Sequence, residues 1–164
     1  MPTARELYIL GLKNAHAMEN QAHEILERQI ERMGDYPQLQ AKLREHLGET
    51  RQQLKRLEEC LAKLDESPST VKDTVMAFGS NMAAMAHAMA GDEVLKNTFA
   101  NSALEHYEIA AYKSLMALAK AAGIGAEPLL AQSLREEEQM ASWVDEHVLG
   151  ITGDYLRHEQ AAAA

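Results

Sequence analysis

Five glutamates interrupt the apolar stripes of the helices that this sequence predicts. They are Glu19, Glu49, Glu105, Glu108 and Glu137. A carboxylate on a buried helix face is costly unless something neutralises it, and no lysine or arginine is evident on the same stripes. Bound metal ions would neutralise all five at once, as in bundles whose helices each direct carboxylate or imidazole ligands into one core.

A histidine stands one turn before the second of these acids. His46 precedes Glu49 by three residues, so it could supply a nitrogen ligand; a plain core or interface role is the alternative. Gln53, one turn after Glu49, could be a weak ligand or donate a hydrogen bond to one. Tyr107 and Tyr112 stand close to Glu105 and Glu108 in the sequence, and either could donate to a ligand carboxylate or bond an ordinary neighbour.

A simpler reading places the same acids at the edges of the bundle. Water or basic side chains from neighbouring turns would then solvate them, and no metal would bind. The basic residues within reach are Lys13, Arg51, Lys55, Lys113 and Arg135.

Apolar residues recur at steps of three and four along most of the chain, which is typical of amphipathic helices. The pattern predicts helices from about Thr3 to Met33, Gln38 to Leu64, Asp92 to Ala122 and Pro128 to Val148, with one or two shorter helices from Val71 to about Ala90. Glycine and proline mark the breaks, and Gly150 is expected to close the last helix. We therefore expect an all-α antiparallel four-helix bundle with additional short helices.

Residues 1–150 are expected to form one domain and residues 151–164 a C-terminal tail. Within this tail, the polar stretch from Tyr155 to Ala164 is expected to be frayed or docked on a partner subunit. Met76, Met82, Met85 and Met89 cluster in the shorter helical stretch. Methionine at helical spacing is more often adaptable packing than a soft-metal site, and a self-association surface is the functional use that we expect.

Composition excludes several classes of partner. Sixteen basic residues against 25 acidic ones give a formal charge of -9, which disfavours nucleic acid. Cys60 is the only cysteine, so no internal disulfide can form, and its place in a leucine stripe predicts a buried thiol. No apolar run approaches the roughly 18 residues of a membrane span, and we expect a bacterial cytoplasmic location.

Four strings of residues resemble the YciE/YciF family of bacterial ferritin-like proteins. They are Ala17–Gln21, His46–Gln53, Glu105–Tyr112 and Leu134–Glu137. The string Glu-His-Tyr-Glu-Ile-Ala-Ala-Tyr is the most specific. The resemblance implies a ferritin-like core, a homodimer, a di-iron site and a role in stress. By position it implies ligands at Glu19, Glu49, Glu105, Glu108 and Glu137, with His46 as an added nitrogen donor. Iron is the expected metal, and manganese or zinc would suit similar ligands.

The chain departs from the usual di-iron pattern, which carries Glu-x-x-His on two helices. Gln52 follows Glu49 at that spacing, and Met140 follows Glu137. Members of the family carry an acid where this chain has Ala141, so its last helix offers fewer ligands. Two functions follow as hypotheses: an iron protein that reacts with oxygen or peroxide, or a structural helical dimer in which the metal is non-catalytic or absent.

Overall fold

The computed structural model describes residues 1–68, 92–125 and 127–163, and every regular element within this part is a helix. Its helices are α1 (Ala4–Arg32), α2 (Pro37–Ala62), α4 (Glu93–Ala121) and α5 (Glu127–Ala162). The all-α architecture is confirmed. The helices α1, α2 and α4 begin and end close to their predicted bounds, whereas α5 begins as predicted but ends later than predicted. The predicted short helices and the methionine cluster lie outside the described residues.

Local signals set the helix ends. Thr3 caps α1, because its hydroxyl accepts from the backbone N–H of Glu6 while the Glu6 carboxylate accepts from the backbone N–H of Thr3. Pro37 opens α2, where its missing N–H costs nothing. After α4, Gly123 adopts a positive φ of 68°. The N–H groups of Gly123 and Ile124 then bond carbonyls of the last turn, which satisfies the helix end.

The prediction that the last helix ends at Gly150 is wrong, because α5 continues to Ala162. Glycine inside a helix costs only about 1 kcal/mol relative to alanine, so packing can override it. Ile151 supplies that packing, since it is 7% exposed and lies in the core. The division into a domain of residues 1–150 and a tail stays a prediction.

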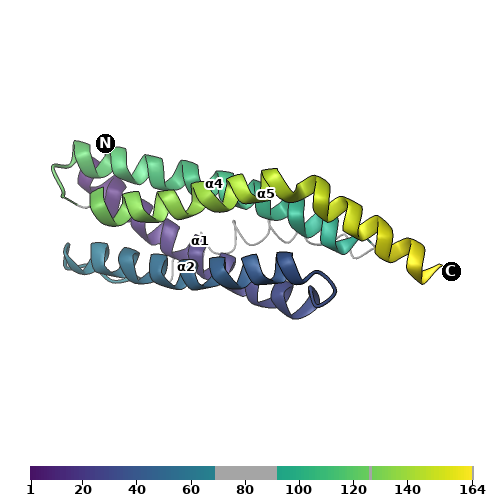
Figure 1. The fold of residues 1–164 in the computed structure, drawn as a ribbon. Helices are drawn as coiled ribbons and strands as arrows, with labels where there is room; N and C mark the ends of the chain where they lie inside the picture. The colour runs from purple at the N-terminus through teal and green to yellow at the C-terminus, as the bar shows by residue number, and fades with distance from the viewer. Residues whose placement is uncertain (69–91, 126, 164) are drawn as a thin grey trace.

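The helices form a bundle in which α1 packs on α2 and α4, and α5 packs on α2 and α4 (Figure 1). Neighbours run antiparallel, so α1 and α5 face each other across a diagonal, as do α2 and α4 (Figure 1). Ligands that point inward from all four helices therefore converge on the bundle axis.

Two apolar clusters fill the core. One includes Tyr8, Leu12, Leu61 and Leu115, and the other includes Leu26, Leu43, Met140 and Val144. On α1, α4 and α5, buried polar residues lie between the stretch that contributes to one cluster and the stretch that contributes to the other. On α2, the buried polar residues lie beside the residues that contribute to the clusters. We call eight of these residues the polar layer: Glu19, His46, Thr50, Gln53, Glu105, Glu108, Ser133 and Glu137.

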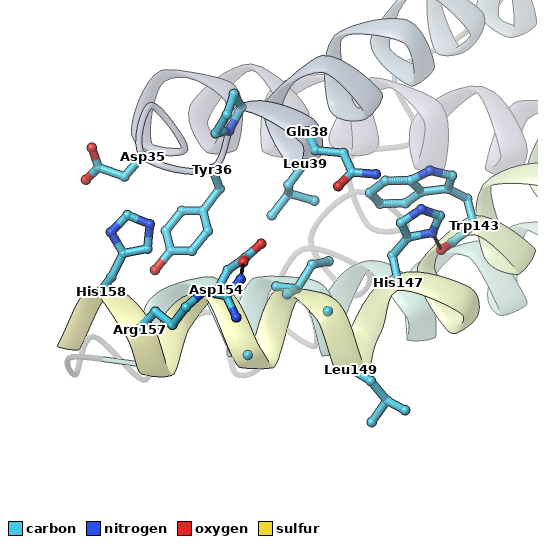
Figure 2. Close-up of a pocket in the computed structure, with 14 residues that line it drawn as sticks. Asp35, Tyr36, Gln38, Leu39, Trp143, His147, Leu149, Asp154, Arg157 and His158 are labelled. Carbon is cyan, nitrogen blue, oxygen red and sulfur yellow. Dashed lines mark hydrogen bonds and ion pairs between the residues drawn. The ribbon is translucent and has the colours of Figure 1, made fainter. Parts of the chain in front are cut away.

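A groove of about 500 Å³ lies at the end of the bundle, between the α1–α2 turn and the C-terminal part of α5 (Figure 2). Trp143 stacks on His147 along one side, and the rings of Tyr36 and His158 lie 5.0 Å apart along another. No residue of the polar layer lines this groove. In the described part of the chain, no helix is long and apolar enough to span a membrane.

Candidate metal centre

Four buried side chains of the polar layer converge within the bundle. His46 comes from α2, Glu105 and Glu108 from α4, and Glu137 from α5. One ligand atom from each lies within 4.8 Å of the others. The spacing of three residues on α4 places both of its carboxylates on the same helix face. We call this group the His46 cluster.

The His46 ring lies against the carboxylates of two other helices. Its Nε2 atom is 3.3 Å from Glu105 Oε2 and 3.7 Å from Glu137 Oε2. Its Nδ1 atom donates to Glu49 Oε2 at 3.0 Å. A carboxylate on one ring nitrogen fixes the orientation of the ring and leaves the other nitrogen to serve as a ligand.

Three carboxylate oxygens of the cluster are buried and form no hydrogen bond with the described residues: Glu105 Oε2, Glu108 Oε1 and Glu137 Oε2. The first and third of them face His46 Nε2 as ion pairs, at 3.3 and 3.7 Å. Unpartnered buried acceptors are costly and rare in native proteins. No ion pair in the described part joins a lysine or arginine to these three glutamates. Three hard oxygens and one imidazole nitrogen are a donor set that suits a divalent first-row metal ion. The residues present therefore fit a metal.

The acids carry pKa values displaced by their surroundings. Burial, with the charge of Glu137, raises the pKa of Glu108 well above its ordinary value. Burial, with the charge of Glu105, does the same for the pKa of Glu137. Burial opposes a proton on His46, but the carboxylates of Glu105 and Glu49 outweigh it and raise the pKa of His46 well above 6.5. The metal-free cluster therefore holds protons where a cation would sit.

Two predicted ligands lie outside the His46 cluster. Glu19 is 1% exposed, and its Oε1 accepts a 2.7 Å hydrogen bond from the hydroxyl of Tyr112. Burial raises the pKa of Glu19 to about 7, although the hydrogen bond from Tyr112 and the nearby His46 limit the rise. The Glu49 side chain is 23% exposed and binds the outer nitrogen of His46. Ligation by Glu19 or Glu49 stays a prediction.

Gln53 and its neighbours complete one side of the polar layer. The Gln53 amide nitrogen donates to Glu137 Oε1 and, at 3.1 Å, to Glu136 Oε2. The Arg56 guanidinium in turn donates two hydrogen bonds to Glu136, at 2.6 and 2.8 Å. Sequence reasoning missed Arg56 and Glu136, although Arg56 follows Gln53 by one helical turn and its length lets it reach across to α5.

Solvation at the edges of the bundle does not describe four of the five acids, because Glu19, Glu105, Glu108 and Glu137 are each at most 1% exposed. Glu49 is partly exposed. Three of the basic residues invoked for such solvation pair elsewhere: Lys13 with Glu66, Arg51 with Glu27 and Lys113 with Glu138. Cys60 is a buried free thiol, as predicted. His106 is exposed, with its Nδ1 on the Ser102 carbonyl, so it points away from the cluster as expected.

A four-helix bundle with a buried His/Glu cluster between its helices defines the ferritin-like class of carboxylate proteins. Comparison with known proteins shows which family within this class the chain belongs to. The family described as Domain of unknown function (DUF892) matches residues 3–157. The chain belongs to this family, and the resemblance to YciE/YciF proteins is confirmed.

Solved structures of similar proteins agree with the fold. A protein from Xanthomonas campestris pv. campestris is 31% identical with a TM-score of 0.80, over 96% of this chain and 99% of that chain. YcfI from Rhodopseudomonas palustris, described as a candidate structural protein, is 28% identical with a TM-score of 0.76, over 88% and 94%. The E. coli stress protein YciF is 21% identical with a TM-score of 0.78, over 93% and 99%. The likeness to YciF shows the fold alone.

Proposed function

We propose that this protein binds a divalent metal ion at the His46 cluster, with iron as the first candidate, and that the loaded site reacts with oxygen or peroxide. The observation that carries the proposal is the set of three buried carboxylate oxygens beside His46 that form no hydrogen bond with the described residues. Manganese and zinc accept similar donor sets, so metal supply as well as geometry would select the ion.

The chain's own residues would prepare the site. Glu49 orients the His46 ring, and Gln53 holds the Glu137 carboxylate from the side. Apolar clusters above and below the polar layer exclude water, which strengthens every electrostatic contact inside it. A bound redox-active ion would supply Lewis acidity and electron transfer to oxygen or peroxide.

A cellular role in stress, in the bacterial cytoplasm, is part of this proposal. It is supported by the fold shared with YciF, which is described as a stress protein. A protein that consumes peroxide and sequesters ferrous iron would limit oxidative damage. The catalytic half of the proposal predicts that loaded protein oxidises ferrous iron faster than buffer does.

The first test is the metal content of protein purified without chelators or a metal-binding tag, measured by plasma emission. We expect bound iron, or its uptake by metal-free protein under anaerobic ferrous reconstitution, and loss of both in Glu105→Gln. Glu138→Gln is the matched control, because Glu138 is a half-exposed acid paired with Lys113. Protein that takes up no metal after reconstitution would contradict the proposal.

A structural role is the second candidate. The missing Glu-x-x-His spacings favour it, since they remove imidazoles that di-iron sites usually carry. An ion held by α2, α4 and α5 would then join three helices without turnover. Binding to the folded state alone would raise the melting temperature of loaded protein, whereas ferrous oxidation would remain at the rate of buffer.

We also propose a homodimer, which is compatible with either function. Phe99 on α4 and Leu156 on α5 are 55% and 53% exposed, as expected for side chains that a partner covers. Sedimentation at several concentrations tests the dimer, and a monomer throughout would contradict it.

A further inference from the structure

We propose that the His46 cluster holds one divalent cation per chain, and that Gln53 is the residue that excludes a second. The inference rests on the proposed metal binding and concerns its stoichiometry. It departs from the two-ion arrangement that the ferritin-like class usually carries.

A single ion would find four protein ligands in the cluster. His46, Glu105, Glu108 and Glu137 each offer one atom, and these atoms lie within 4.8 Å of one another. Ligands of one six-coordinate ion with bonds of about 2.1 Å stand roughly 3 to 4 Å apart. The cluster therefore needs only a slight contraction to surround a single ion.

A second ion would need further ligands of its own from α1 and α2. The carboxylates expected to supply them, Glu19 and Glu49, each form a hydrogen bond with another side chain. Glu19 lies outside the cluster with one oxygen bound to the Tyr112 hydroxyl. Glu49 is turned toward the outer face of His46, where its Oε2 accepts from Nδ1. Neither carboxylate shares the compact arrangement of the other four groups.

Gln53 occupies the buried position on α2 that faces Glu137. Its amide nitrogen lies between two carboxylates, those of Glu136 and Glu137. The amide nitrogen, and not the carbonyl oxygen, therefore faces both carboxyl groups. The amide N–H group thus donates to the Glu137 oxygen that a second ion would share. The amide nitrogen keeps its two hydrogens and is only a donor, so it cannot ligate a metal.

The positive charge of Arg56 also disfavours a second cation beside Gln53. Arg56 contacts Glu136, so its guanidinium stands behind Gln53. Gln53 is 0% exposed, and its side-chain carbonyl oxygen has no hydrogen-bond partner in the described part of the chain. This oxygen is neutral, so it would be a weak ligand. A second divalent ion would therefore meet a neutral amide and a nearby positive charge.

The test counts ions and asks whether they are neighbours. Metal-free wild type and Gln53→Glu are titrated with Mn²⁺, bound manganese is measured after dialysis, and electron paramagnetic resonance distinguishes isolated ions from coupled pairs. We expect one isolated ion in the wild type and two coupled ions in Gln53→Glu. Gln52→Glu adds an acid at the exposed neighbouring position and should still bind one.

Gln53→Met keeps the side chain neutral and of similar length but removes the N–H groups that hold Glu137, so it separates the loss of the amide from the gain of a carboxylate even where Gln53→Glu fails to fold. Without a new ligand at this position, a second ion still lacks a binding group. Gln53→Met should therefore bind one isolated ion. Two ions in the wild type would overturn the inference while leaving metal binding intact. A single ion in folded Gln53→Glu would overturn the assignment to Gln53. Absence of binding by the wild type would instead overturn the proposed function.

Discussion

The Tyr112 hydroxyl donates to Glu19 Oε1 at 2.7 Å, and the two side chains are 0% and 1% exposed. This hydrogen bond joins α4 to α1 within the polar layer. It gives one oxygen of a deeply buried carboxylate a hydrogen-bond donor, which three oxygens of the His46 cluster lack.

Tyr112→Phe should destabilise the metal-free protein by about 1–3 kcal/mol at pH 8, because Glu19 is then ionised and loses its donor. The loss should be smaller at pH 5, where Glu19 carries its own proton. Urea unfolding at both pH values measures the difference. Tyr107→Phe, on the exposed face of the same helix, is the control. Equal losses for Tyr112→Phe at the two pH values would contradict the assignment.

The metal-free protein should lose stability as the pH rises from about 5 to 8. Burial raises the pKa of Glu19 from 4.5 to about 7, so in that window the folded chain keeps a proton that the unfolded chain releases. The free energy of unfolding then falls with pH, by about 3 kcal/mol from Glu19 alone. The raised pKa values of Glu108, Glu137 and His46 act in the same direction.

Chemical unfolding of the metal-free protein across this pH range measures the slope. Glu19→Gln should make the slope shallower, because the amide does not titrate while Glu108, Glu137 and His46 still do. A metal-free protein whose stability rises from pH 5 to pH 8 would refute this account of the buried acids.

Glu49→Gln should weaken metal binding about 10- to 100-fold, because the amide no longer fixes the His46 ring as a carboxylate does. The number of ions bound at saturation should stay the same. Calorimetric titration gives both quantities. Glu45→Gln, an exposed acid one turn earlier, should leave the affinity unchanged. A lost ion in Glu49→Gln would show instead that Glu49 is itself a ligand.

Ile151→Ala should cost about 2–4 kcal/mol of folding stability, since it removes a buried side chain from the apolar cluster at that end of the bundle. Leu149→Ala is the matched control, because Leu149 is 84% exposed and its loss should change stability by less than about 0.5 kcal/mol. Thermal unfolding followed by circular dichroism compares the two. Equal effects would mean that the end of α5 is not anchored by the core.

The helical repeat fixes much of this structure in advance. Residues three and four apart share a face, so the sequence alone could predict that Glu105 and Glu108 point inward together and that His46 joins them. The helical repeat cannot decide whether Glu19 is a ligand, or whether Glu49 is one. Their positions depend on partners from outside the stripe, namely Tyr112 on another helix and the outer nitrogen of His46.

Two features escaped the sequence pattern for other reasons. Arg56 lies at the margin of the apolar face, and only the length of its side chain brings it to Glu136. Gly150 resembles a helix end locally, but the burial of Ile151 decides in favour of a continued helix. In both cases tertiary contacts decide what local propensity leaves open.

The polar layer also separates the two apolar clusters of the core. Each cluster can hold its own end of the bundle together, so the cooperativity of unfolding depends on how firmly the layer between them is bound. Without an ion, only the hydrogen bonds and ion pairs of the layer join the helices there, so the two ends can open as separate units at different free energies. An ion that ties α2, α4 and α5 at mid-height would make them open together, so that hydrogen exchange at both ends would report a single global event.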